Sequence, residues 1–222
     1  MEVPKRTLKR GLGGTSFAKR IVTERESLVP LLSALRDLAA WFAAEDVKGA
    51  VIGGVAVSLL ARPRFTRDVD AVVWLGEERW AGFLGAGRRH GFVARHDDVL
   101  GFARDTRVLL VRHEPSSIDV DVSFGSLPFE EESIDTAMDV DVGGVRFRVP
   151  SPENLIVMKA VASRPRDLAD IEALVDAYPE LNARKVRSYV RAFASILEMP
   201  EIFERIDAIL KRRPSRARSK KK

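Results

Sequence analysis

Two aspartates stand two residues apart at the start of a β-branched stretch, a spacing that suits the binding of a cation. Asp68 and Asp70 lie in the segment 67–75, which we expect to be a strand. Residues i and i+2 of a strand face the same side, so both carboxylates project from one face at the strand's edge. Two like charges at that separation repel unless a cation lies between them. The pair therefore indicates a cation site or a strand face exposed to water, because Asp-x-Asp also occurs on ordinary exposed strands.

A second acidic strand is expected in the same half of the chain. From Ile118 to Phe124, apolar residues alternate with Asp119, Asp121 and Ser123, which places the three polar side chains on one face. Carboxylates from two such strands can converge, and hard divalent ions such as Mg²⁺ take oxygen ligands of this kind. Two ions about 3.5–4 Å apart would support in-line phosphoryl or nucleotidyl transfer. The alternative interpretation is ordinary alternation on a sheet face exposed to water.

A glycine pair precedes these carboxylates. Gly53 and Gly54 stand between a short apolar run, 50–52, and an uncharged run, 55–61, so a strand, a turn and a helix are expected in that order. Glycines there let backbone N–H groups approach an anion, and the helix N-terminus adds partial positive charge. A Gly-Gly pair alone could be an ordinary tight turn. Its position one helix before the aspartate pair favours a phosphate-binding turn.

Hydrophobic periodicity predicts a mixed α/β half followed by a helical half. In the first half we expect helices at 27–44, 55–61 and 77–90 and strands at 50–52, 67–75, 92–96, 107–112, 117–124, 137–142 and 145–149. After Pro150 we expect helices at 151–163, 167–177, 182–197 and 200–212. The predicted organisation is a basic N-terminal segment, 1–20, an α/β core, 21–150, a C-terminal helical domain, 151–212, and a basic disordered tail, 213–222.

The charge of the chain is divided unevenly. The 222 residues hold 37 lysines and arginines against 32 acids, a net charge of +5. Eight of these cations lie in residues 211–222 and six in residues 1–20, which leaves 23 cations and 31 acids between 21 and 210. The body is therefore acidic and the ends are basic. Basic ends of this kind either bind a polyanion or act as solubilising tails.

Several classes of protein are excluded by composition. The chain has no cysteine, which removes disulfide frameworks, thiol catalysis and zinc–cysteine sites. Its three histidines share no ligand spacing. The longest uncharged stretch, 49–61, is 13 residues long, whereas a membrane-spanning helix needs about 18 or more. We therefore expect a cytoplasmic protein without a membrane span or a secretory signal.

Four motifs, taken in order, resemble one group of enzymes. They are Gly53-Gly54-x-Ala56, Arg64-x-Thr66-x-Asp68-Val69-Asp70, Asp121-Val122-Ser123-Phe124 followed by Leu127-Pro128-Phe129-Glu130, and Ser151-Pro152-Glu153-Asn154-Leu155 running through Lys159 to Asp167 and Asp170. Together they resemble the DNA polymerase beta-like nucleotidyltransferase superfamily. More narrowly, the chain is similar to the small bacterial branch that contains the AbiEii and AbiGii type IV toxins and the MenT toxins. The resemblance covers about residues 46–175.

The resemblance implies a fold and a reaction. The fold would be the minimal nucleotidyltransferase fold, α/β (α+β) with a mixed sheet, followed by a C-terminal helical domain. The reaction would be the Mg²⁺-dependent transfer of a nucleoside monophosphate from a nucleoside triphosphate to a hydroxyl, with two metal ions that Mn²⁺ could replace. Asp68 and Asp70 would hold the two ions, and Asp121 would complete the metal site and help to deprotonate the acceptor. Asp119 shares the face of Asp121, but the spacing to Pro128 favours Asp121.

The resemblance also assigns nucleotide-binding residues. The backbone of Gly53 and Gly54 would hold the β- and γ-phosphates, and Lys159 would reach the triphosphate from the helical half. The remaining residues expected near the nucleotide are Arg64, Thr66, Asp167 and Asp170. The residues alone place Lys159 on or beside the apolar stripe of its helix. A lysine at such a position either has a functional role or packs its aliphatic stem against the protein while its ammonium reaches water. Asp167 could equally cap the helix that begins near it, and Asp170 could equally be solvated.

Partners follow only from the resemblance. The acceptor would be RNA, tRNA in particular, or a protein. The enzyme itself would be the toxin of a toxin–antitoxin or phage-defence pair with a cognate antitoxin.

The chain departs from the family at Gly54, where the commonest turn has serine, and at Ala61, where many relatives have glycine. Neither departure removes an expected metal ligand, so both would bear on nucleotide affinity more than on catalytic capacity. The alternative is a catalytically inactive nucleotide-binding or antitoxin-like relative with the same fold.

Overall fold

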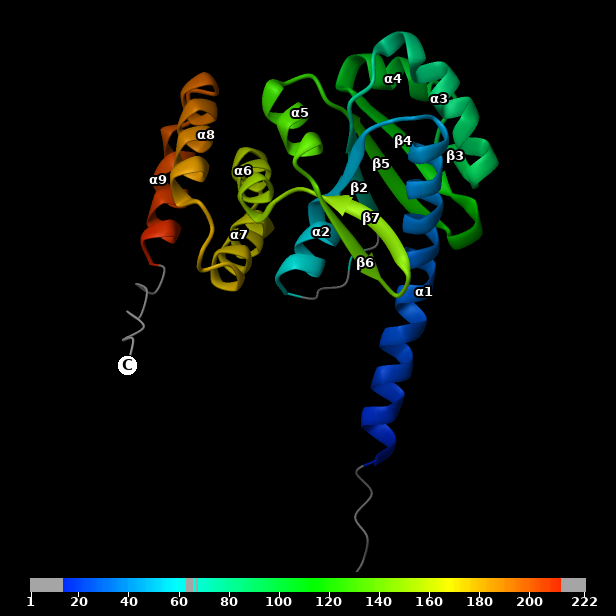
Figure 1. Cartoon of the computed structure of the whole chain (residues 1–222), viewed down its shortest axis with the longest axis horizontal. Coiled ribbons are helices and arrows are strands. Elements are labelled where there is room, and N and C mark those ends of the chain that lie inside the picture. Colours follow the sequence, from blue (N-terminus) through cyan, green and yellow to red (C-terminus); the bar gives the residue numbers. More distant parts are fainter. Residues whose placement is uncertain (1–13, 63–65, 67, 213–222) are drawn as a thin grey trace, which may run out of the picture.

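The computed structural model describes residues 14–62, 66 and 68–212, with side chains from residue 28 onward. The predicted basic tail at 213–222 therefore lies outside the described residues, as does the predicted N-terminal segment except for 14–20. Those seven residues form the start of a long helix, α1 (Gly14–Ala44), which begins well before the expected residue 27. The N-terminal part of α1 extends away from the body of the molecule (Figure 1).

A mixed five-stranded sheet organises the first half, as expected. Its spatial order is β1-β2-β5-β4-β3, formed by β1 (Gly49–Ile52), β2 (Asp68–Val73), β3 (Phe92–Ala94), β4 (Val108–His113) and β5 (Ile118–Phe124). Only β2 and β5 run parallel in this sheet, and the other neighbours pair antiparallel. Because β2 and β5 are parallel neighbours, the two acidic segments start at the same edge of the sheet.

Aromatic side chains pack between the sheet and its helices. The indole of Trp41, in α1, stacks on Phe83 of α3 (Trp80–Gly87) and on Phe92 of β3, with ring centroids 4.2 and 5.0 Å apart. The Trp41 indole N–H also donates to the Phe83 carbonyl at 3.1 Å. This contact holds α1 and α3 against the sheet and leaves the opposite side available to the other helices.

Two short helices in the first half were not predicted. They are α4 (Val99–Thr106) and α5 (Pro128–Asp135), each of eight residues. Helices of this length lack enough turns to show periodicity and are stabilised mainly by caps and tertiary packing. The Asp98 carboxylate caps α4 by accepting from the Gly101 N–H at 3.0 Å. The Glu130 carboxylate closes the first turn of α5 by accepting from the Leu127 N–H at 3.0 Å.

A β-hairpin ends the first half, and the second half is helical. The hairpin pairs β6 (Met138–Val142) with β7 (Val145–Val149) around Gly143-Gly144, as expected. It is followed by α6 (Pro152–Ala162), α7 (Pro165–Ala177), α8 (Ala183–Ile196) and α9 (Pro200–Lys211). Short 3₁₀ turns occur at Glu77–Arg79, Arg88–His90 and Glu114–Ser116. Within the described part of the chain, no helix is long and apolar enough to cross a membrane.

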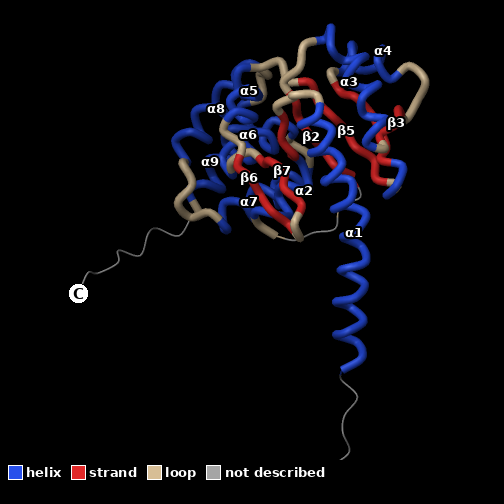
Figure 2. The backbone as a smooth tube through the Cα atoms, turned by 45° about the vertical axis from the view of Figure 1, so that its right-hand side comes forward, coloured by secondary structure: helices blue, strands red, loops and turns tan. Residues whose placement is uncertain are grey.

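The two halves are joined through the helix that follows the glycine pair. Helix α2 (Gly53–Leu60) packs against β2 on one side and against α6 and α7 on the other. Figures 1 and 2 show α6–α9 gathered on one side of the molecule, with α2 between α6 and the sheet. Buried apolar side chains from both halves belong to one hydrophobic cluster. The packing thus brings the α6–α7 corner next to the glycine turn.

Candidate active site

The acidic residues of β2 and β5 are paired by the register of the sheet. Asp70 lies directly across from Asp121, and Asp68 lies across from Asp119. Neighbouring strands are about 4.8 Å apart, so side chains on one face of such a pair are close neighbours. Asp70 and Asp121 are half-buried, whereas Asp68 is exposed at the start of its strand. The structure therefore brings together two carboxylates that are 51 positions apart in sequence.

Electrostatics indicate that three of these carboxylates act on one another. Burial raises the pKa of Asp70, and repulsion from Asp68 raises it further. Burial also raises the pKa of Asp121; Arg95 opposes this rise, and the negative charges of Asp70 and Asp68 add to it. A group of like charges held close together in a half-buried place is unfavourable without a cation. The three side chains thus form one electrostatic unit.

Arginines distinguish Asp121 from its neighbour Asp119. The Arg95 guanidinium lies between them, with Nη2 2.6 Å from Asp121 Oδ1 and Nη1 3.4 Å from Asp119 Oδ2. Asp119 also accepts from Arg112 Nε at 2.7 Å, and the pKa of Asp119 is lowered, chiefly by this hydrogen bond. Asp119 is therefore paired with two arginines, while Asp121 pairs with Arg95 and lies across from Asp70.

Arg95 was not singled out from the sequence. It follows β3, and its backbone N–H donates to the Leu110 carbonyl at 3.1 Å, which extends the pairing with β4 and aims the side chain across β4 to β5. Its Nε is buried without a hydrogen-bond partner. Because Arg95 and Asp121 meet across three strands, no local pattern in the sequence could have linked them.

The carboxylates fit a divalent cation by their chemistry. Asp68, Asp70 and Asp121 offer hard oxygen donors, and their mutual repulsion favours a positive partner. Among the residues that the structure describes, no group of three or more acidic or imidazole side chains is already arranged as a metal site. Asp121 instead has Arg95 as its cation in this structure. The expected roles of the three aspartates as metal ligands remain predictions.

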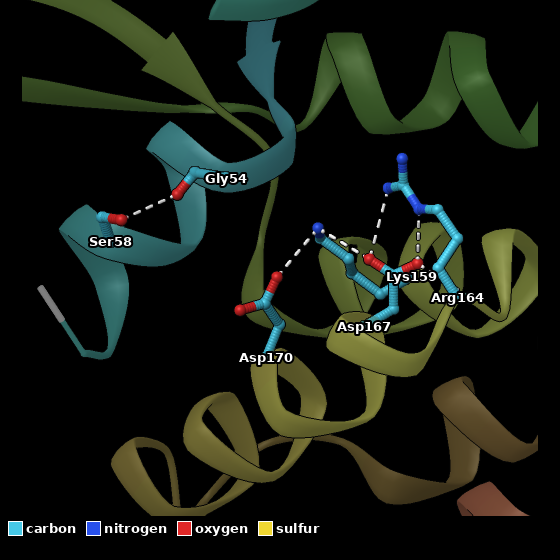
Figure 3. Close-up of polar contacts among 6 residues, drawn as sticks. All are labelled: Gly54, Ser58, Lys159, Arg164, Asp167 and Asp170. Carbon is cyan, nitrogen blue, oxygen red and sulfur yellow. Dashed lines mark hydrogen bonds and ion pairs between the residues drawn. The ribbon is translucent and has the colours of Figure 1, made fainter. Parts of the chain in front are cut away.

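The glycine turn is in contact with this carboxylate group. Gly53 has φ +65°, and a Cβ placed on it would lie 1.9 Å from Asp70 Oδ2. The backbone N–H of Gly54 is hydrogen-bonded to Asp70, which lowers the pKa of that carboxyl. One turn later, the Ser58 hydroxyl donates to the Gly54 carbonyl at 2.8 Å (Figure 3). The first turn of α2 therefore directs the N–H of Gly54 at the negative charge of Asp70.

Replacing Gly53 with alanine should therefore disturb both the turn and Asp70. A left-handed backbone costs a non-glycine residue about 1–2 kcal/mol, and the steric overlap with Asp70 adds to it. We expect Gly53→Ala to lower the free energy of unfolding by about 2 kcal/mol or more. Gly82→Ala is the control, because a Cβ at this exposed position in α3 meets nothing within 4 Å. Denaturant unfolding that gives equal stability for both variants would contradict the strained turn.

A buried ion network occupies the corner between α6 and α7. Lys159 Nζ lies 3.0 Å from Asp167 Oδ1 and 2.9 Å from Asp170 Oδ2, and the three residues are at most 6% exposed. Two interpretations are therefore wrong: that the stem of Lys159 carries its ammonium to water, and that Asp170 is solvated. The apolar stripe of α6 places this lysine inside the protein because α7 presents two carboxylates one turn apart.

Asp167 has a capping role as well. Its Oδ2 accepts from the backbone N–H of Arg164 at 3.0 Å, at the residue before α7 begins. The Arg164 side chain binds the same carboxylate, with Nε 2.8 Å from Oδ2 and Nη2 3.2 Å from Oδ1. Arg164 was also missed from the sequence, although its position three residues before Asp167 was a local signal that could have been used.

The other residues predicted to bind nucleotide are less well defined. Thr66 is half-buried and lies two residues before β2. Arg64 lies outside the described residues. Their assignment to the nucleotide therefore stays a prediction.

Comparison with known proteins agrees with the architecture. The family model described as nucleotidyl transferase AbiEii toxin, type IV toxin–antitoxin system, matches residues 35–220. The solution structure of the antibiotic-resistance factor ANT(2'')-Ia aligns with a TM-score of 0.54 at 17% identity, over 77% of this chain and 95% of that one. A crystal structure of an antigenic nucleotidyltransferase-like protein from Paracoccidioides brasiliensis aligns with a TM-score of 0.49 at 15% identity, over 80% and 92%. No curated protein sequence gives a significant match.

These results confirm the predicted family and fold class. The family model spans the strands, the glycine turn and the α6–α7 corner, and the ANT(2'')-Ia structure shares the fold. The protein is a nucleotidyltransferase, and its family implies a nucleotide substrate and a cognate antitoxin. The chain belongs to the AbiEii family of nucleotidyltransferase toxins of type IV toxin–antitoxin systems.

Proposed function

We propose that this enzyme transfers a nucleoside monophosphate from a nucleoside triphosphate to a hydroxyl acceptor, with Mg²⁺ as its cofactor. The main support is the register of β2 and β5, which sets Asp70 directly beside Asp121. The mutual repulsion among these two residues and Asp68 gives the site a need for cations that a solvated strand face does not have. The catalytically inactive alternative offers no reason for such a costly group of charges.

Asp68, Asp70 and Asp121 are the residues that would hold the metal ions. When bound, two such ions stabilise the charge that develops on the attacking and leaving oxygens of an in-line displacement. The protein supplies the remaining parts. The Gly53–Gly54 turn presents backbone N–H groups at the start of α2, which is the part of the site suited to the β- and γ-phosphates.

Asp121 is suited to handle the proton of the acceptor. The hydroxyl oxygen forms a bond to the α-phosphorus while the bond to the bridging oxygen breaks, and pyrophosphate leaves. The hydroxyl proton passes to the carboxylate of Asp121, which has a raised pKa and lies on the β5 side of the site. Arg95, paired with both Asp121 and Asp119, limits the motion of this carboxylate.

The acceptor is proposed to be RNA, with tRNA as the first candidate, or a protein. The toxin role implies that the modified acceptor is needed for growth and that the antitoxin opposes its modification. The acidic body of the chain and its basic ends suit a polyanion bound at the ends. Parallel reactions with total RNA and with total protein distinguish the two kinds of acceptor.

Transfer of label from the triphosphate tests the proposal. The purified protein is incubated with each α-labelled nucleoside triphosphate, Mg²⁺ and either acceptor pool, and label should appear in one pool. The same triphosphates labelled at the γ-position should give no labelled acceptor, because that phosphate leaves in pyrophosphate. Chelation of divalent ions should stop the reaction.

The matched control uses a second Asp-x-Asp pair of the same spacing. Asp139 and Asp141 are exposed on β6, so Asp139→Ala/Asp141→Ala should keep the activity. Asp68→Ala/Asp70→Ala should remove it. Equal incorporation by the wild type and the Asp68→Ala/Asp70→Ala variant would show that these carboxylates do not carry out the transfer.

A further inference from the structure

The α6–α7 corner contains two cations of very different accessibility. Lys159 is 4% exposed and lies between two buried carboxylates. The side chain of Arg164 binds the same Asp167 carboxylate but is 51% exposed. In Figure 3 the Lys159 ammonium sits between Asp167 and Asp170, whereas the Arg164 guanidinium extends past Asp167. The two cations therefore occupy the inner and the outer end of one network.

The inner cation is held between two protein carboxylates. Its partners, Asp167 and Asp170, are themselves buried, so almost none of the Lys159 side chain is open to a phosphate. A buried carboxylate that loses its cation is strongly destabilised. Lys159 is for this reason suited to hold α6 and α7 together rather than to contact a substrate.

Both cations of the corner act on the carboxylate site. Lys159 and, after it, Arg164 lower the pKa of Asp70, and Asp70 contributes to raising the pKa of Arg164. Asp70 is in turn hydrogen-bonded to the backbone of Gly54. Both cations thus lie on the helical side of the site, where α6 and α7 pack against α2, but only the Arg164 side chain, 51% exposed, is open to a ligand. Asp167 holds two of its nitrogens and orients the planar guanidinium.

We propose that Arg164, rather than Lys159, is the residue of the helical half that binds the triphosphate of the nucleotide. The inference rests on the proposed nucleotidyl transfer and adds a binding residue to it. Guanidinium groups form paired, charge-assisted hydrogen bonds with phosphate oxygens. Lys159 acts through Asp167 as a positioning residue for Arg164. The network therefore couples the stability of the α6–α7 corner to the binding of the phosphates.

Nucleotide binding, measured without turnover, tests this assignment. A triphosphate with a methylene group between its α- and β-phosphorus atoms, titrated by calorimetry with Mg²⁺, reports affinity alone. Arg164→Ala should weaken binding of this analogue by about ten- to a hundredfold, the loss of charge-assisted hydrogen bonds. Binding of the corresponding monophosphate should change by less than about threefold, because it lacks the phosphates that Arg164 contacts.

Matched variants separate binding from folding. Arg166→Ala removes another exposed arginine, in the first turn of α7, and should leave both affinities unchanged. In the alanine variant the backbone N–H of residue 164 still donates to the Asp167 carboxylate, so the melting temperature should fall only modestly. If Arg164→Ala does not fold, Arg164→Lys keeps the charge but loses the paired geometry, and it should bind the triphosphate less tightly than the wild type.

The outcomes distinguish failure of the inference from failure of the function. If the wild type binds the triphosphate and Arg164→Ala binds it equally well, the assignment of Arg164 is overturned while the transferase proposal stands. An equal loss for monophosphate and triphosphate would also overturn it. A wild-type protein that binds none of the four triphosphates would overturn the proposed function and this inference together.

Discussion

Replacing Lys159 with methionine is expected to destabilise the protein by about 3–5 kcal/mol, the usual cost of removing one partner from a buried ion pair. Methionine has a similar volume, so the loss would come from charge rather than from a cavity. Asp167 and Asp170, both nearly inaccessible to water, would then share one buried place without the ammonium between them. Chemical denaturation followed by circular dichroism measures the difference.

Compensating and surface variants identify the cause. Lys159→Met/Asp167→Asn/Asp170→Asn removes both negative charges along with the lysine and should recover much of the stability. Lys48→Met breaks an exposed pair with Asp135 and should change stability by less than about 1 kcal/mol. A Lys159→Met variant as stable as the wild type, but with lower nucleotide affinity, would instead make Lys159 a substrate-binding residue.

Replacing Asp70 with asparagine is expected to abolish transfer while making the metal-free protein more stable. Loss of a carboxylate that stabilises charge in the transition state reduces turnover by about 10²–10³-fold or more. The same change removes a half-buried charge that Asp68 repels and whose pKa is raised. Sites that sacrifice stability for function commonly regain about 0.5–2 kcal/mol when the functional group is removed.

The pH dependence of stability has a definite sign. Because the pKa of Asp70 is raised above its ordinary value of 3.8, the folded protein binds more protons than the unfolded chain between that value and the raised one. The contribution of Asp70 to stability therefore declines as the pH rises through this interval, and the penalty is complete above it. Asp70→Asn should show its gain at neutral pH and lose it in acid.

Unfolding curves in the presence of a chelator, at neutral and acidic pH, test both statements. Asp139→Asn, on the exposed strand β6, is the control and should change neither transfer nor stability appreciably. An Asp70→Asn variant that is less stable at neutral pH would contradict the strained carboxylate site. One that keeps full transfer activity would remove Asp70 from the reaction.

The fold class could be predicted from the sequence because it follows from local patterns of residues. Alternation of apolar and acidic residues predicted β2 and β5, and the glycine pair predicted the turn into α2. Prolines marked the starts of α6 and α9. Helices α4 and α5 were not predicted, because these eight-residue helices depend on capping by Asp98 and Glu130 and show no clear apolar periodicity.

What the sequence by itself determined was the set of chemical groups and the order in which the chain presents them: a glycine turn, an acidic pair, a second acidic strand, and a lysine followed by two aspartates. Only the tertiary structure decided which of them meet. The register of two parallel strands set Asp70 beside Asp121, and helix packing closed Asp167 and Asp170 around Lys159. Arg95 and Arg164 joined them because strand pairing and a helix corner aim their side chains. Such contacts depend on burial and on pairing between segments that are distant in the sequence. The free energy of burial and pairing cannot be inferred from the spacing of neighbouring residues.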